Sequence, residues 1–177
     1  HWCQGYSEPD AGSDLANVST RARLEGDRWL VTGQKTWTSL AQHAQWAFVL
    51  CRTDPAAERH AGLSYLLVPM DQPRVEVRPI VQITGGSECK EVFVDEAETD
   101  AGLVVGGVGN GWAVAMGTLG FERGASTLGQ QTGYRRELDA LLGLARSNGS
   151  IDDPPLRQDL MRSYSELEIL RYNQLRM

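Results

Sequence analysis

The sequence predicts an α+β fold, with a β-barrel domain followed by two long antiparallel helices of an incomplete helical bundle. Three observations lead to this prediction. Short apolar runs separated by Pro, Gly and Asp fill the first part of the chain, a glycine-rich stretch at 106–111 ends that pattern, and apolar residues then recur every three or four positions. We therefore expect a β-domain over residues 1–105 and the start of a helical domain over residues 106–177.

Six segments have the composition of β-strands and are bounded by turn residues. Gly26-Asp27 lies between the first two, and Gly in the first turn position favours a type II′ hairpin. The expected strands cover residues 22–25, 28–32, 46–52, 63–68, 75–80 and 91–94. Several short strands with turn signals between them favour a barrel or a sandwich.

Two helices are expected after the glycine-rich stretch. Asn110 is a suitable N-cap for the first helix, and Asn148-Gly149 is a suitable stop. The second begins at Asp153-Pro154, because Asp caps helices and Pro fits the first helical position. Its apolar residues fall on one stripe, namely Leu156, Leu160, Tyr164, Leu167 and Leu170. Two helices cannot bury both apolar faces alone, so further helices of a bundle are implied.

Composition and charge exclude several classes of protein. The net charge of −6 and the absence of any basic run argue against a nucleic-acid partner, although a local cationic pocket could still bind an anionic small molecule. No apolar run is long enough for a membrane span, and we expect no signal peptide. Three widely spaced cysteines indicate reduced thiols and a cytoplasmic protein. Because the chain lacks an initiator Met and opens on a motif, we expect it to be a fragment.

The usual metal and phosphate motifs are missing from the sequence. His1, His43 and His60 show no ligand spacing, so no metal site is predicted. The P-loop and the GxGxxG fingerprint are absent, and the glycines at 106–111 are most simply a turn into the first helix.

Two polar stretches, 8–14 and 33–39, are candidates for ligand contact. The second places Trp37 among hydroxyl side chains, including Ser39, and a flat heteroaromatic cofactor needs a stacking surface and donors to its edge. The simpler interpretation of the second stretch is a strand with its Trp in the core, and that of the first is a loop rich in turn residues.

Glu122 is the candidate catalytic residue of the first helix. It falls on the same helical face as Ala115, Leu119 and Ser126. A carboxylate on an apolar face is desolvated, and desolvation raises its pKa toward the range of a general base. The alternative is a structural ion pair at a helix–helix or subunit contact.

Taken together, these stretches resemble the acyl-CoA dehydrogenase family, specifically its middle β-domain and the first helices of its C-terminal domain. The resemblance covers nearly the whole chain and rests on ordered motifs at 6–14, 33–39, 83–87, 91–95, 109–112 and 121–123. One departure is that the family usually follows the last barrel strand with a turn containing Val-Pro, where this chain has Ala97-Glu98-Thr99-Asp100. The family's N-terminal helical domain and later helices have no counterpart here.

The resemblance implies an FAD cofactor and assigns roles to particular residues. Tyr6 and Ser7 match positions that bind the pyrimidine edge of the flavin, Trp37 matches a residue packed against the isoalloxazine, and Ser39 matches a hydroxyl residue near flavin N5. Ser13 lies where the family contacts the thioester arm of the substrate.

Catalysis is also implied by the resemblance. Most members place the base late in the C-terminal domain, but a subset uses a Glu at the position of Glu122, and the adjacent Arg123 is expected to contact the substrate. Glu122 would remove the α-proton of an acyl-CoA while the β-hydride passes to flavin N5, with electrons leaving to an electron-transfer flavoprotein. The family implies fatty-acid oxidation in a homo- or hetero-oligomer, a dimer or a tetramer. The alternatives are an oxygen-using relative (an oxidase or a flavin monooxygenase) and a non-catalytic subunit of a heteromeric enzyme.

Overall fold

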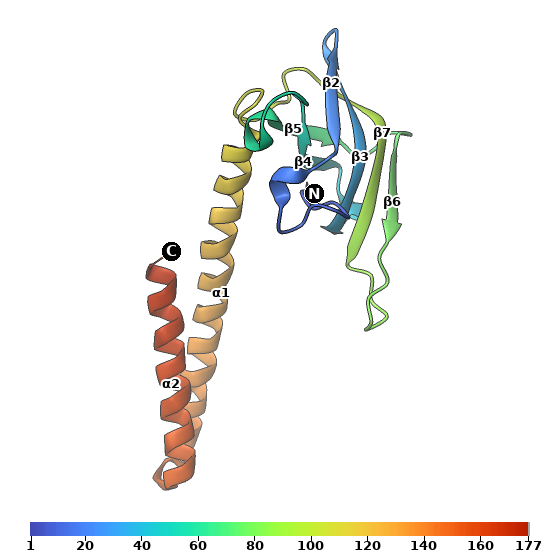
Figure 1. Ribbon diagram of the computed structural model, residues 1–177. Coiled ribbons are helices and arrows are strands. Elements are labelled where there is room, and N and C mark those ends of the chain that lie inside the picture. Colours follow the sequence, from blue (N-terminus) through green and yellow to red (C-terminus); the bar gives the residue numbers. More distant parts are fainter. Residues whose placement is uncertain (177) are drawn as a thin grey trace. The chain divides into compact units, whose positions relative to one another are not determined.

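The computed structural model describes residues 1–176, except for the side chains of residues 123–128. The chain divides into two compact units, His1–Met116 and Gly117–Met177. Figure 1 shows that strands build the first unit and helices the second. The predicted α+β class is confirmed.

Seven strands form one sheet in the first unit. The order of its neighbours is β1-β4-β2-β3-β7-β6, and β5 pairs with β4 outside this path. β1 and β2 meet β4 in parallel, whereas the other pairs are antiparallel. The strands are β1 (Trp2–Gly5), β2 (Arg21–Glu25), β3 (Arg28–Ser39), β4 (Trp46–Arg52), β5 (Leu63–Pro69), β6 (Val75–Pro79) and β7 (Cys89–Asp100).

Local signals located most of these strands. The predictions for β2, β4, β5 and β6 agree with the structure to within one residue at each end. The hairpin between β2 and β3 is confirmed, and Gly26 has the positive φ of +60° that the first position of a type II′ turn requires. The sequence analysis missed β1, whose four residues are too few for an alternation to be recognised.

β3 and β7 are much longer than predicted because bulges let them pair along most of their length. The expectation of a turn at 97–100 is wrong, since Ala97 pairs with Val31 and Asp100 pairs with Arg28. Glu96 adopts a φ of 56°, and the register shifts there, so one extra residue of β7 is absorbed before pairing resumes.

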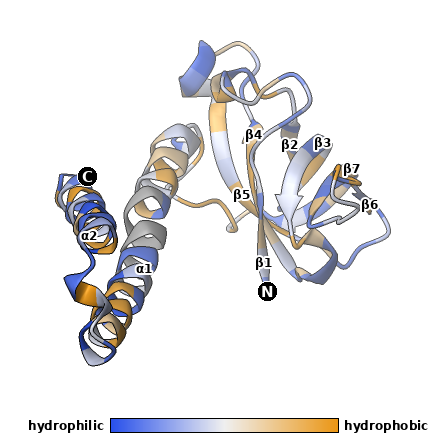
Figure 2. Cartoon of the chain, turned by 90° about the horizontal axis from the view of Figure 1, so that it is seen from below, coloured by the Kyte–Doolittle hydropathy of each residue, from blue (hydrophilic) through white to orange (hydrophobic). Residues whose placement is uncertain are grey.

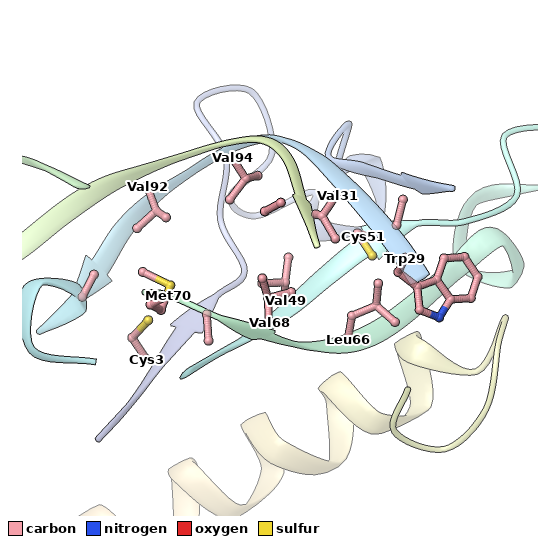
Figure 3. Packing of buried hydrophobic residues seen from close by; sticks show 14 residues of the cluster. Cys3, Trp29, Val31, Val49, Cys51, Leu66, Val68, Met70, Val92 and Val94 are labelled. Carbon is pink, nitrogen blue, oxygen red and sulfur yellow. The ribbon is translucent and has the colours of Figure 1, made fainter. Parts of the chain in front are cut away.

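The core of the first unit lies between the β3–β7 ribbon and the β4–β5 pair (Figure 3). Its fully buried members include Val31, Leu66 and Ala97. Two of the three cysteines also belong to it, and burial raises the pKa of Cys3 to about 11 and that of Cys51 to about 12. Both are therefore packing residues rather than reactive thiols.

The second unit contains most of α1 (Gly111–Ser147), a short turn of 3₁₀ helix at Ser150–Asp152, and α2 (Pro154–Leu175). α1 begins directly after Asn110, as predicted, and the side-chain NH₂ group of Asn110 donates to the Gly106 carbonyl (3.1 Å). Gly149 lies two residues beyond the end of α1 and has a φ of +78°. Asp153 caps α2 as predicted by accepting a hydrogen bond from the Leu156 backbone N–H (3.4 Å).

An apolar seam joins α1 and α2. Leu160 and Leu167 of the predicted stripe are buried in it, whereas Tyr164 stays partly exposed. Their partners on α1 are Leu138, Leu142 and Ala145. Apolar residues, orange in Figure 2, are not confined to this seam; the exposed ones include Leu141, Leu144, Met161, Ile169 and Tyr172. Among residues 1–176, no helix is long and apolar enough to cross a membrane.

Candidate functional site

Trp37 is the most unusual aromatic residue of the sheet. The residue is 60% exposed, and its backbone has a φ of 59°, a left-handed conformation that residues other than Gly rarely adopt. It lies in a bulge of β3, because Lys35 pairs with Val92 and Thr38 pairs with Lys90, which leaves two β3 residues opposite one. Strained residues of this kind persist only where the surrounding structure holds them, and they concentrate at functional sites.

The bulge decides which way the end of β3 faces. Before it, the buried residues Trp29, Val31 and Lys35 have odd numbers, and after it the buried residue is Thr38. A shift of one residue exchanges the two faces of a strand. Trp37 and Ser39 are consequently exposed on either side of a buried Thr38. The simpler prediction, that Trp37 lies in the core, is wrong.

The segment after β1 lies directly beside this end of β3. The backbone N–H of Thr36 donates to the Ser7 carbonyl at 2.8 Å, so half-buried Ser7 lies next to the bulge. Tyr6 is buried, and its hydroxyl forms a hydrogen bond with that of Tyr65 at 3.0 Å. The structure therefore brings Ser7, Trp37 and Ser39 to one end of the sheet, which we call the β3 wall, and directs the Tyr6 ring into the interior.

A buried ion pair, which was not predicted from the sequence, adjoins the β3 wall. The side chains of Lys35 and Glu8 are only 2% and 3% exposed, and Lys35 Nζ lies 2.8 Å from Glu8 Oε1. Lys35 also donates to the carbonyls of Tyr6 (3.0 Å) and Leu50 (2.7 Å). A signal was available, since Lys35 lies on the odd-numbered, inward face of β3, where a charge requires a partner.

The pKa values of the pair follow from its surroundings. Burial alone would raise the pKa of Glu8, but Lys35 and the hydrogen bonds from Thr20 and Ser19 lower it to about 2. Burial lowers the pKa of Lys35, and the Glu8 carboxylate opposes that change. Glu8 is thus ionised throughout the physiological pH range.

Ser13 lies in the exposed loop that leads from the Glu8 segment to β2. The neighbouring Asp14 accepts a hydrogen bond from Arg59 at 2.7 Å, which links this loop to the connection between β4 and β5. Ser13 is therefore accessible to a ligand.

A pocket of about 410 Å³ opens where β2 and β4 separate, because these strands pair only at Arg21 and Arg52. Every charged residue among its described lining is an arginine, although Arg23 is also ion-paired with Glu25 and Glu96. The pocket therefore combines cationic groups with apolar surface in a chain whose net charge is negative. Its lining residues are Ser19, Arg21, Ala22, Arg23, Leu24, Leu30, Arg52, Thr53 and Pro55.

Glu122 and Arg123 lie on α1 in the second compact unit. Glu122 is exposed on the described chain, and the side chain of Arg123 lies outside the described residues. The catalytic and substrate-binding functions of these two residues stay predictions.

The β3 wall has the chemistry that a flavin ring requires. An exposed indole provides a stacking surface, and the hydroxyls of Ser7 and Ser39 are hydrogen-bonding groups beside it. Next to them, the Thr38 hydroxyl is buried without a hydrogen-bond partner among the described residues. The residues present therefore fit a flat heteroaromatic group with polar edges.

Comparison with known proteins identifies the two parts of the chain separately. Residues 3–97 match the acyl-CoA dehydrogenase middle domain, and residues 109–177 match the acyl-CoA dehydrogenase C-terminal domain. The chain is 62% identical over 170 residues to acyl-CoA dehydrogenase IpdE1 of Mycobacterium tuberculosis, which covers 96% of this chain and 44% of that protein. It is 35% identical to the human mitochondrial short-chain specific acyl-CoA dehydrogenase over 68% of this chain and 30% of that enzyme.

Solved structures of similar fold agree with this family assignment. A G363A variant described as the Tcur3481-Tcur3483 steroid ACAD superposes with a TM-score of 0.85 at 32% identity, over 99% of this chain and 46% of that one. The ChsE4-ChsE5 complex of Mycobacterium tuberculosis superposes with a TM-score of 0.72 at 28% identity, over 99% and 46%. The chain thus spans less than half the length of these relatives.

Proposed function

The chain belongs to the acyl-CoA dehydrogenase family, and we propose that the full-length protein catalyses FAD-dependent α,β-dehydrogenation of an acyl-CoA thioester. The resemblance predicted from the sequence motifs is thereby confirmed at the level of the family. The activity, the cofactor and the residue roles are our proposal.

The observation that carries this proposal is the β3 wall. A largely solvent-exposed indole in a left-handed backbone conformation lies outside the described core of the sheet, yet the bulge holds it there beside two hydroxyl side chains. We assign Trp37 to stacking, Ser39 and Ser7 to hydrogen bonds at the polar edge of the cofactor, and Tyr6 to supporting the segment that carries Ser7. Bound FAD would supply the hydride acceptor for the β-carbon.

The remaining chemistry belongs to side chains of this protein. Glu122 is the proposed base that takes the α-proton, and Arg123 and Ser13 are the proposed substrate contacts. Removal of the α-proton develops negative charge on the thioester oxygen, so hydrogen-bond donors directed at that oxygen stabilise the transition state. An active site that excludes water strengthens these interactions.

The arginine-lined pocket supports a phosphorylated substrate. An acyl-CoA carries phosphate groups far from its reacting carbons, and guanidinium groups recognise phosphates well. Arg21 and Arg52 provide such groups in the first unit, although Arg52 also donates to the carbonyls of Ala16 (2.9 Å) and Arg59 (3.2 Å). One structurally similar protein is named a steroid ACAD, which favours including steroid-derived thioesters among the substrates tested.

Anaerobic titration of the full-length protein with a panel of acyl-CoAs tests the proposal. The panel should contain straight-chain, branched and steroid-derived thioesters. The wild type should hold FAD, and the preferred thioester should bleach its visible absorbance. Glu122→Gln should bind the same thioester but reduce the flavin at least about a thousandfold more slowly, because a positioned base contributes factors of this order.

The matched control is Glu137→Gln, another change of a glutamate on α1. This variant should reduce FAD as the wild type does. Normal flavin reduction by Glu122→Gln would show that the base lies elsewhere. A wild-type protein that holds FAD but is not bleached by any acyl-CoA would contradict the proposed activity.

The relatives also support assembly of the protein with a different subunit. Two structurally similar proteins are named as pairs, the Tcur3481-Tcur3483 steroid ACAD and the ChsE4-ChsE5 complex. We propose a homo- or hetero-oligomer in the cytoplasm, with an electron-transfer flavoprotein as electron acceptor. If the full-length protein does not hold FAD alone but gains it with a partner subunit, the heteromeric arrangement is favoured. Rapid reoxidation of the reduced protein in air would instead favour an oxygen-using enzyme.

A further inference from the structure

We propose that the buried Glu8–Lys35 pair is a positioning device for the β3 wall, holding Ser7 and Trp37 in place for the flavin. This inference rests on the proposed function, since it takes the β3 wall to be the surface that the flavin contacts. It assigns a role in cofactor binding to two residues that do not themselves lie on the exposed face of that wall.

The pair connects four segments that are distant in the sequence. Lys35 Nζ joins β3 to the Tyr6 carbonyl, to Glu8 and to the Leu50 carbonyl of β4. Glu8 accepts hydrogen bonds from the backbone N–H of Ser19 (2.6 Å) and of Thr20 (3.0 Å), and from the Ser19 hydroxyl (2.8 Å). All three protons of the ammonium group therefore have acceptors, and both carboxylate oxygens have donors.

This network adjoins the β3 wall on two sides. The residue before Ser7 is held through its carbonyl by Lys35, and the residue after Ser7 is Glu8 itself. On β3, Lys35 is the last regularly paired residue before the bulge that contains Trp37. Ser7 and the bulge are in turn joined by the hydrogen bond from Thr36 to the Ser7 carbonyl.

The strained backbone of Trp37 explains why such an anchor is needed. A left-handed conformation costs free energy at any residue other than Gly, and the exposed indole recovers little of it by packing. The conformation is therefore retained only if the residues on both sides are immobilised. Thr38, which is 1% exposed and pairs with Lys90, immobilises the following side, and Lys35 immobilises the preceding side.

Stability alone does not account for a charged pair at this place. Replacing a buried ion pair by apolar side chains of similar volume is often neutral or stabilising. Apolar side chains, however, could not bind the carbonyls of Tyr6 and Leu50 or the N–H groups of Ser19 and Thr20. The directional bonds are what the pair adds, and they converge on the segments that carry Ser7 and Trp37.

The test compares Glu8→Gln with Leu66→Ala in the full-length protein. Leu66 is fully buried in the core on β5, so its truncation lowers stability without touching the network. For each variant, urea unfolding gives the stability, titration of the apoprotein with FAD gives the Kd, and the visible spectrum of bound FAD reports the environment of the ring.

Both variants should be less stable than the wild type. Only Glu8→Gln should also weaken FAD binding, by about tenfold, which corresponds to about 1.4 kcal/mol, and change the shape of the visible flavin band. Ser19→Ala keeps the ion pair and removes one hydroxyl donor, so it should weaken FAD binding less, by about threefold, and it serves as the graded variant if Glu8→Gln does not fold.

The outcomes separate this inference from the proposed function. A wild-type protein that binds no FAD, alone or with a partner, overturns the proposed function and this inference with it. A wild-type protein that binds FAD, with Glu8→Gln or Ser19→Ala binding it as tightly as Leu66→Ala does and with an unchanged flavin spectrum, overturns the positioning role alone.

Discussion

Two ion pairs of this protein join distant parts of the chain in opposite surroundings. In the first unit, Lys35 and Glu8 are almost fully buried and are surrounded by hydrogen-bond partners. In the second, Arg135 of α1 meets Glu168 of α2 at 3.0 Å, but the Arg135 side chain is 40% exposed. A cation–carboxylate pair is therefore enclosed by the protein in one place, and in the other it lies beside an apolar seam with its cation partly exposed and its carboxylate 16% exposed. Burial, rather than distance, makes the difference.

The largest effect that would test this comparison is the loss of one buried charge. Lys35→Met removes the cation and leaves the Glu8 carboxylate buried without its partner. We expect a loss of about 3–5 kcal/mol in the free energy of unfolding, the usual cost of breaking a buried pair from one side. Urea unfolding measures it. The double variant Glu8→Leu with Lys35→Met should recover part of the loss, and an equally large or larger loss in the double variant would contradict the explanation.

Acid should weaken the first unit through Glu8. The folded pKa of Glu8, about 2, lies below the ordinary 4.5, so its contribution is fully present above pH 4.5 and is lost as the pH falls toward 2. The size of this contribution is about 3 kcal/mol, from a difference of about 2.5 pKa units. Urea unfolding of the wild type and Glu8→Gln as a function of pH should show the two stabilities converging below about pH 4. A difference independent of pH would show that Lys35 does not hold the folded pKa down.

The smallest effect is expected between the helices. Glu168→Gln weakens the contacts with Arg135 and Arg171, both at the surface, while the seam around Leu160 and Leu167 stays intact. The urea midpoint should change by no more than about 0.3 M, and salt should reduce the difference further because it screens exposed charges. A loss as large as that of Lys35→Met would mean that burial does not distinguish the two pairs.

Local patterns predicted much of the fold. The Gly26-Asp27 hairpin, three of the later strands and the Asp153 cap all depend on residues that are neighbours in the chain, and each was located from composition and spacing. The full lengths of β3 and β7 could not be predicted in this way, because they depend on pairing with each other across bulges at Trp37 and Glu96.

The candidate site was likewise predicted only in part from the sequence. Its motifs indicated Ser7, Trp37 and Ser39 as candidates, and the family that those motifs resemble is confirmed. Their accessibility was not predictable, since regular alternation places Trp37 on the same face as buried Lys35. Glu8 falls in the stretch interpreted as a loop and Lys35 in the stretch interpreted as a strand, yet nothing in their spacing indicated that the two side chains meet.

The sequence by itself determined the family, the order of six of the seven strands and of both long helices, and the turn and cap chemistry, because these depend on short-range steric and hydrogen-bonding preferences and on ordered motifs. Only the tertiary structure decided that Trp37 faces solvent and that Lys35 is buried with Glu8. Both outcomes depend on the register between β3 and β7 and on the approach of the Glu8 segment to β3, which are long-range contacts. One residue of bulge reverses the faces of a strand, and the chain alone does not reveal where that residue is inserted.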